Sequence, residues 1–125
     1  MMFRNFLLVG IGGAVGSMAL YGVSFAMNRF VPQPHTWVST FTVNIVGCLL
    51  IVILFGLSPR SHWLEAGGYL LLASGFCGGF TTFSSFALEN VNFLQKGQSM
   101  LALAYVGLSI VLGLLFCRVG IWLAS

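Results

Sequence analysis

Charged side chains are scarce in this sequence. The 125 residues include five Lys and Arg and two Asp and Glu, so 6% are charged while 58% are hydrophobic, and the mean hydropathy is +1.01. A water-soluble domain needs a far more polar surface, so the composition excludes one. The net charge of +3 is too small to suggest a nucleic-acid partner. We therefore expect an integral membrane protein surrounded by lipid.

Cysteine and histidine are also sparse. Cys48, Cys77 and Cys117 fall within apolar stretches, their number is odd and no pair has the spacing of metal ligands, so we expect small buried hydrophobic side chains. His35 and His62 lie in predicted loops. No nucleophile and base, and no metal-binding set, can be assembled from the remaining ionisable groups. We expect no enzyme and no organic cofactor.

The few charges separate long charge-free stretches. A helix that spans a bilayer needs about 20 apolar residues, and four stretches are long enough. The sequence predicts one transmembrane domain over residues 1–125, an all-α membrane protein. Its four helices are expected at approximately residues 6–27, 37–57, 66–94 and 98–123.

Glycine interrupts the third of these segments. Gly75, Gly78 and Gly79 lie a third to halfway along it, where glycine weakens a helix and lets another backbone approach closely. We expect a broken helix, with the break near residues 75–81.

The first segment carries a surface of small residues. Gly12 and Gly16 form a small-xxx-small pair, which permits close helix contact within a chain or between subunits. Four short spans enclose too little space for a pore, so we expect a two-fold dimer and assign these two glycines to its packing.

Charge placement hardly selects an orientation. With a cytoplasmic amino terminus, three Arg lie on that side and one Arg and one Lys on the other, so the positive-inside rule gives almost no bias. Such a chain can insert in both directions and pair head to tail. A single orientation, set by Arg4 and Arg60, is the alternative.

Polar side chains follow the glycines of the third segment. Thr82, Ser85 and Glu89 recur at i, i+3 and i+7 and so share one helical face, with Phe83 and Phe86 beside it. Ring edges carry partial positive charge, and weak sites without Lys or Arg suit conduction of a small anion. Hydroxyls bonded to their own helix, with phenylalanines that face lipid, are the structural alternative.

An amide and an opened backbone add polar groups at membrane depth. Asn44 lies in the second segment and needs partners, either in a hydrogen bond between helices or in a polar pathway. Backbone opened at Gly78 and Gly79 would offer carbonyl oxygens where protein covers them. If two copies met there, a cation could bind between them.

The chain as a whole resembles the Fluc/CrcB fluoride channels. The resemblance covers the four short spans, the glycine-rich first segment, Thr42-Val43-Asn44 and, most specifically, the run GFCGGFTTFSSF at residues 75–86. It implies an antiparallel, dual-topology homodimer in the bacterial cytoplasmic (inner) membrane. Two pores would let fluoride leave the cytoplasm passively, which confers fluoride resistance.

The resemblance also implies roles for individual residues. Phe83 and Phe86 match the rings whose edges contact fluoride, Asn44 matches the pore asparagine that donates an amide hydrogen, and Ser84 and Ser85 match the hydroxyl positions beside the rings. The carbonyls of two further residues would hold a structural sodium ion at the dimer centre: Gly78 and Thr81. The remaining pore positions are expected at Thr82, Tyr105, Ser109 and Glu89.

One position departs from the family pattern. Members usually carry Arg after the glycines of the first segment, where this chain has Leu20. Its loss would weaken anion attraction or mark a chain that forms a heterodimer with a paralogous subunit, so a non-conducting partner subunit is the alternative function. A small multidrug exporter is a further rival, but it needs a membrane-embedded carboxylate, commonly in the first helix, and the first segment contains no acid.

Overall fold

The computed structural model describes residues 2–30 and 36–124. Four segments in it are long and apolar enough to cross a membrane: Met2–Phe30, Thr36–Arg60, Leu70–Gln95 and Ser99–Ala124. No strand occurs within the two described ranges. The expected all-α fold with four membrane-spanning segments is confirmed, and the chain is a multi-pass membrane protein.

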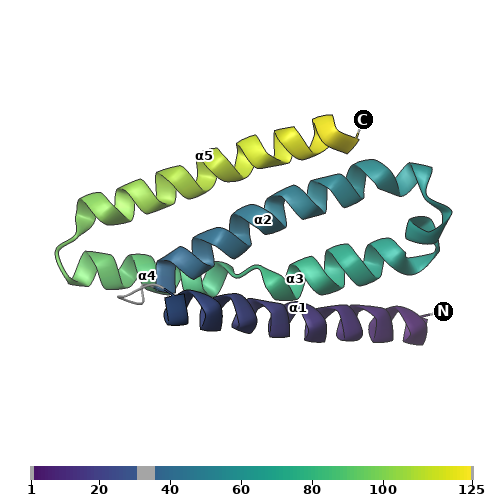
Figure 1. The fold of residues 1–125 in the computed structure, drawn as a ribbon, viewed down its shortest axis with the longest axis horizontal. Helices are drawn as coiled ribbons and strands as arrows, with labels where there is room; N and C mark the ends of the chain where they lie inside the picture. Colours follow the sequence, from purple (N-terminus) through teal and green to yellow (C-terminus); the bar gives the residue numbers. More distant parts are fainter. Residues whose placement is uncertain (1, 31–35, 125) are drawn as a thin grey trace.

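Three of the spans are continuous helices. They are α1 (Met2–Phe30), α2 (Thr36–Leu57) and α5 (Ser99–Ala124). Figure 1 shows α1 and α5 on opposite sides of the molecule, with α2 and the third span between them. The most extensive contacts are those of α2 with α5 and of α1 with the first part of the third span, η3 (Leu70–Cys77). The predicted loop at His35 lies outside the described residues.

The third span is a broken helix, as expected. After η1 (Ser58–Arg60) and η2 (Leu64–Gly68), it consists of η3 (Leu70–Cys77), α3 (Gly78–Phe80) and α4 (Phe83–Gln95). The chain leaves helical geometry at Thr81 (φ −93°, ψ 160°) and Thr82 (φ −151°, ψ 118°). The break therefore falls at the end of the expected range, and the three glycines themselves lie in helical segments.

The glycines of α1 pack against the third span of the same chain. A Cβ on Gly12 would overlap the carbonyl oxygen of Leu71, and one on Gly16 would overlap that of Phe76. Both glycines are buried, so the two backbones approach closely here. The assignment of Gly12 and Gly16 to dimer packing is corrected, because their surface is already covered within the chain.

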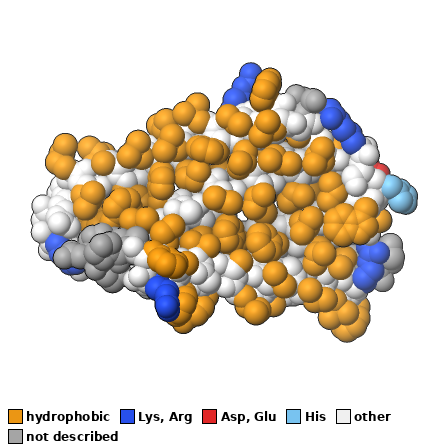
Figure 2. Space-filling model, in the orientation of Figure 1, with side chains coloured by type: hydrophobic (Ala, Val, Ile, Leu, Met, Phe, Trp, Pro, Cys, Tyr) orange, Lys and Arg blue, Asp and Glu red, His pale blue; other side chains and the backbone are white. Residues whose placement is uncertain are grey.

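Hydrophobic side chains dominate the outer surface. Figure 2 shows them over most of the visible face, with Lys and Arg along its margins. Large exposed hydrophobic residues occur on every span, including Phe3, Phe55, Phe83 and Trp122. Lipid or another protein chain must cover such a surface.

Candidate functional site

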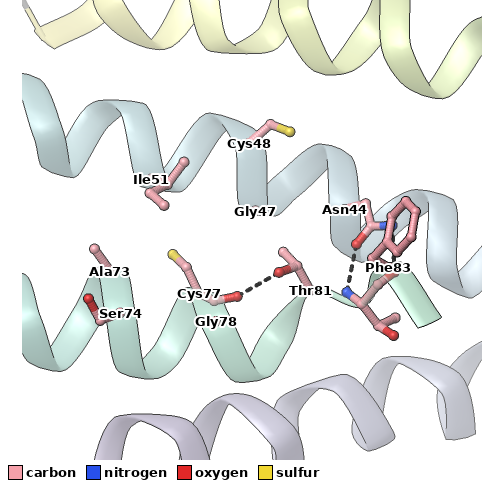
Figure 3. Close-up of a pocket in the computed structure, with 11 residues that line it drawn as sticks. Asn44, Gly47, Cys48, Ile51, Ala73, Ser74, Cys77, Gly78, Thr81 and Phe83 are labelled. Carbon is pink, nitrogen blue, oxygen red and sulfur yellow. Dashed lines mark hydrogen bonds between the residues drawn. The ribbon is translucent and has the colours of Figure 1, made fainter. Parts of the chain in front are cut away.

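The break in the third span is held by a side chain from α2. The Nδ2 group of Asn44 donates to the carbonyl oxygen of Thr82 at 3.1 Å, and the Thr82 amide donates to Asn44 Oδ1 at 2.9 Å. Figure 3 shows the Asn44 side chain directed at the extended backbone after Thr81. An unwound peptide at membrane depth needs such substitute partners. Of the two roles considered for Asn44 from the sequence, the structure shows the hydrogen bond between helices.

Hydroxyl groups on either side complete the ends of the two helical pieces. Thr82 Oγ1 accepts from the amide of Ser85 at 3.2 Å, which is an N-cap of α4, and it shares a 3.3 Å hydrogen bond with Ser84 Oγ. Thr81 Oγ1 donates to the carbonyl oxygen of Cys77 at 2.9 Å. Of these hydroxyls only that of Ser84 belongs to an exposed residue.

These substitute bonds deprive two carbonyl groups of their helical donors. In a continuous helix the amide of residue i+4 donates to carbonyl i, so Thr82 would serve Gly78 and Ser85 would serve Thr81. Both amides donate elsewhere, to Asn44 Oδ1 and Thr82 Oγ1. The carbonyl oxygens of Gly78 and Thr81 are hard oxygen ligands left by the break, and a sodium ion fits this donor type.

Two phenylalanine rings begin α4 beside the break. The centroids of Phe83 and Phe86 are 5.9 Å apart and the rings are inclined by 43°. Phe83 is 78% exposed within one chain, whereas Phe86 is half-buried and meets Tyr105 edge to face, with centroids 4.9 Å apart. The first ring is thus free to contact a partner or an ion, and the second is oriented by α5.

An open cavity of about 380 Å³ lies between α2 and the third span. Figure 3 shows that the lining residues of α2 face those of the third span, which lie before and after the break. The polar residues that line this cavity are Asn44, Ser74, Thr81 and Thr82, and Gly78 and Phe83 line it beside them.

A second cavity, of about 280 Å³, lies on the other side of Thr82 and is lined mainly by polar residues of α1, α2 and α4. Ser17, Leu20 and Ser24 contribute from α1, and Ser85 and Glu89 from α4. No Lys or Arg occurs among the residues that line either cavity. The predicted polar face of the third span therefore borders a cavity, and the neutral side chain of Leu20 lies on the wall of that cavity.

Glu89 is 6% exposed and accepts two hydrogen bonds from neutral hydroxyls. Thr40 Oγ1 donates to one carboxyl oxygen at 2.7 Å, and the Tyr105 hydroxyl donates to the other at 2.8 Å. The predicted pore residues Glu89 and Tyr105 are thus in direct contact. Thr40 was missed by the sequence reasoning, although it precedes Asn44 by one turn of α2 and so shares its face.

Ser109 lies one turn after Tyr105 on α5. Its hydroxyl oxygen is buried and has no hydrogen-bond partner among the described residues, and the same holds for Asn90 Oδ1. Buried polar atoms normally find a partner, so Ser109 keeps a hydroxyl available at membrane depth. Asn90 was not predicted, and no feature of its sequence surroundings pointed to it.

These features define a small, all-helical membrane protein whose third span is broken at a polar site flanked by aromatic rings. The chain matches the family model described as "CrcB-like protein, Camphor Resistance (CrcB)" over residues 7–121. It belongs to that family, which confirms the resemblance stated from the sequence.

Curated relatives cover nearly the whole chain. A protein of Azobacteroides pseudotrichonymphae is 42% identical over 114 residues, which are 90% of this chain and 89% of the relative. A protein of Leptospira interrogans is 38% identical over 96% of this chain and 94% of its own length. One of Flavobacterium psychrophilum is 35% identical over 98% of both. Each is named "Fluoride-specific ion channel FluC".

Proposed function

We propose that this chain forms a fluoride-selective channel that lets cytoplasmic fluoride leave the cell passively. Membership of the CrcB family and the names of its relatives support the proposal. The observation that carries it is the exposed ring of Phe83 beside a helix break held by Asn44. An ion at this break would meet ring edges, an amide and hydroxyls, and no strongly binding cation. The proposal makes the chain a channel and not an enzyme.

The conducting unit is an antiparallel homodimer with dual topology and two pores, in the inner membrane of a bacterium. Two features of a single chain support an assembly: the cavity beside Asn44 is open, and Phe83 is 78% exposed. A second copy would cover this face and supply further groups to each pore. The near balance of basic residues at the two ends of the spans supports insertion in both directions.

Five of the predicted pore residues then have a defined contribution. Phe83 and Phe86 present ring edges to fluoride. The Nδ2 group of Asn44 carries two hydrogens, of which one is used for Thr82, so the other is left for the ion. Ser84 and Ser109 add hydroxyl donors, because the first is exposed and the second has no partner in the described chain.

The resident cation of the assembly is a structural sodium ion at the dimer centre. The carbonyl groups of Gly78 and Thr81 would hold it, since both have lost their helical donors to the bonds at Thr82. When bound, sodium supplies a fixed positive charge between the subunits. None of the proposed contacts with fluoride involves this sodium ion.

A specific observation favours a second candidate, a partner subunit that does not conduct by itself. Leu20 lines the polar cavity of 280 Å³, at a position where the resemblance leads one to expect Arg. Without that charge the cavity attracts anions less strongly. A paralogous subunit with the Arg would restore the charge in a heterodimer.

Fluoride efflux from liposomes tests both candidates. Vesicles that contain only this purified chain are loaded with potassium fluoride, potassium is made permeable with an ionophore, and external fluoride is followed with an electrode. Chloride efflux is measured in parallel, and empty vesicles serve as the control. Rapid fluoride loss without chloride loss is the expected result. Absence of efflux from correctly folded dimers refutes the homodimeric channel and supports the partner subunit.

A further inference from the structure

The three free cysteines are not equivalent in the fold. Cys48 on α2 and Cys117 on α5 meet where these two helices pack, because the Cys117 thiol donates to the carbonyl oxygen of Cys48 at 3.6 Å. Cys77 lies on η3, in the third span. The chain therefore contains one thiol pair and one separate thiol.

The sulfur of Cys48 packs against α5 close to Cys117. A Cβ on Gly113 would lie 3.4 Å from the sulfur of Cys48, and Gly113 precedes Cys117 by one turn on the same face of α5. Figure 3 shows the Cys48 sulfur on the side of α2 that faces α5. Cys48 is also one of the residues that line the open cavity of about 380 Å³.

We propose that Cys48 and Cys117 form a two-thiolate binding site for a soft divalent metal ion with the chemistry of Hg²⁺. Thiolates select soft metal ions, and a two-coordinate ion needs only the two sulfurs that the helices bring together. Tetrahedral zinc takes four ligands, and no group of three or more His, Cys, Asp or Glu side chains able to hold a metal occurs in the described ranges.

Charge balance selects a divalent ion over a monovalent one. Binding breaks two S–H bonds and forms two metal–sulfur bonds, and two protons leave to water as the ion enters. Two thiolates and one divalent cation sum to zero, so the occupied site is as neutral as the two thiols that it replaces. A monovalent soft ion on two thiolates would leave a negative charge at membrane depth, which is costly.

X-ray absorption at the mercury edge tests the site on the purified full-length chain with one equivalent of HgCl₂. Two sulfur ligands are expected for the wild type and for the matched control Cys77→Ser. Cys48→Ser and Cys117→Ser should each show a single protein sulfur. Because two tethered thiolates act at high effective concentration, release of mercury from the wild type should need about 100-fold more competing monothiol than release from either variant.

The wild-type spectrum can overturn the proposal by itself, so a variant that fails to fold does not remove the test. One sulfur ligand in the wild type overturns the proposal. It is overturned equally if Cys77→Ser loses a ligand while Cys48→Ser keeps two. The proposal is independent of what the chain conducts, since no fluoride measurement enters the test.

Discussion

Replacing Asn44 by Leu should release the break in the third span. The substitution keeps a similar side-chain volume but removes both the donor to the Thr82 carbonyl and the acceptor for the Thr82 amide. The Thr82 amide then has one nearby alternative, the carbonyl of Gly78, which is its partner in a continuous helix. We therefore expect the extended backbone at Thr81 and Thr82 to lose its defined geometry.

The cost follows from the two hydrogen bonds. An unsatisfied buried polar group costs about 1–3 kcal/mol, and Thr82 is half-buried beside two cavities that would allow some hydration. We expect Asn44→Leu to lower the free energy of unfolding by about 2–3 kcal/mol, near the lower end of the range for two groups. Because every 1.4 kcal/mol corresponds to a factor of about ten, disorder of this size at the break should reduce fluoride flux at least about tenfold.

Hydrogen exchange separates this positioning role from a direct contact with the ion. Peptides that cover residues 78–86 should exchange faster in Asn44→Leu than in the wild type. The matched control is Thr42→Val, because the Thr42 hydroxyl donates only to the carbonyl of Val38 in its own helix, at 2.8 Å, and exchange should stay unchanged. Wild-type exchange in Asn44→Leu would refute the clamp, even if fluoride flux were lost.

Three further predictions concern the rings, the helix contact and the buried acid. Phe83→Ile and Phe86→Ile should each strongly reduce fluoride efflux from liposomes while the dimer remains visible by crosslinking; full efflux in both would exclude the ring-edge model. Gly16→Val should lower the free energy of unfolding in detergent by more than about 3 kcal/mol, since the valine side chain would meet backbone on η3 and overpacking alone costs about 1–3 kcal/mol. An unchanged melting temperature would contradict this packing. Thr40→Val removes one of two hydrogen bonds to Glu89 and should cost about 1–3 kcal/mol; the same loss in Thr42→Val would show that the effect is not specific to the carboxylate.

The sequence predicted the four spans because each depends on a local property, a long apolar run bounded by charge or proline. It also predicted that the third span is broken. The position of the break could not be read from the glycines, since it depends on Asn44, which is 38 residues away from Thr82 in the chain. Glycine is only permissive here, whereas the hydrogen bonds to Asn44 determine which peptide leaves the helix.

The roles of small and polar residues were predicted less completely for the same reason. Gly12 and Gly16 were correctly identified as a close-packing surface, but the partner of that surface is η3 of the same chain, and a spacing pattern does not specify its partner. The contact of Thr40 with Glu89 joins α2 to α4 across 49 residues. Only the fold brings these two groups together, so no local sequence motif could have predicted their contact.

The hydrogen-bond pattern of the break joins two features that the sequence treated separately. Each bond that stabilises the extended peptide, from Asn44 or from the Thr82 hydroxyl, takes an amide away from a carbonyl of the preceding turn. The carbonyls of Gly78 and Thr81 are therefore released by the same interactions that position Phe83 at the start of α4. Cation ligands and anion-contacting rings then depend on one stretch of backbone. In the proposed channel, a change at Asn44 should consequently weaken sodium binding and fluoride flux together, and a variant that lost one while keeping the other would show that the two sites are built independently.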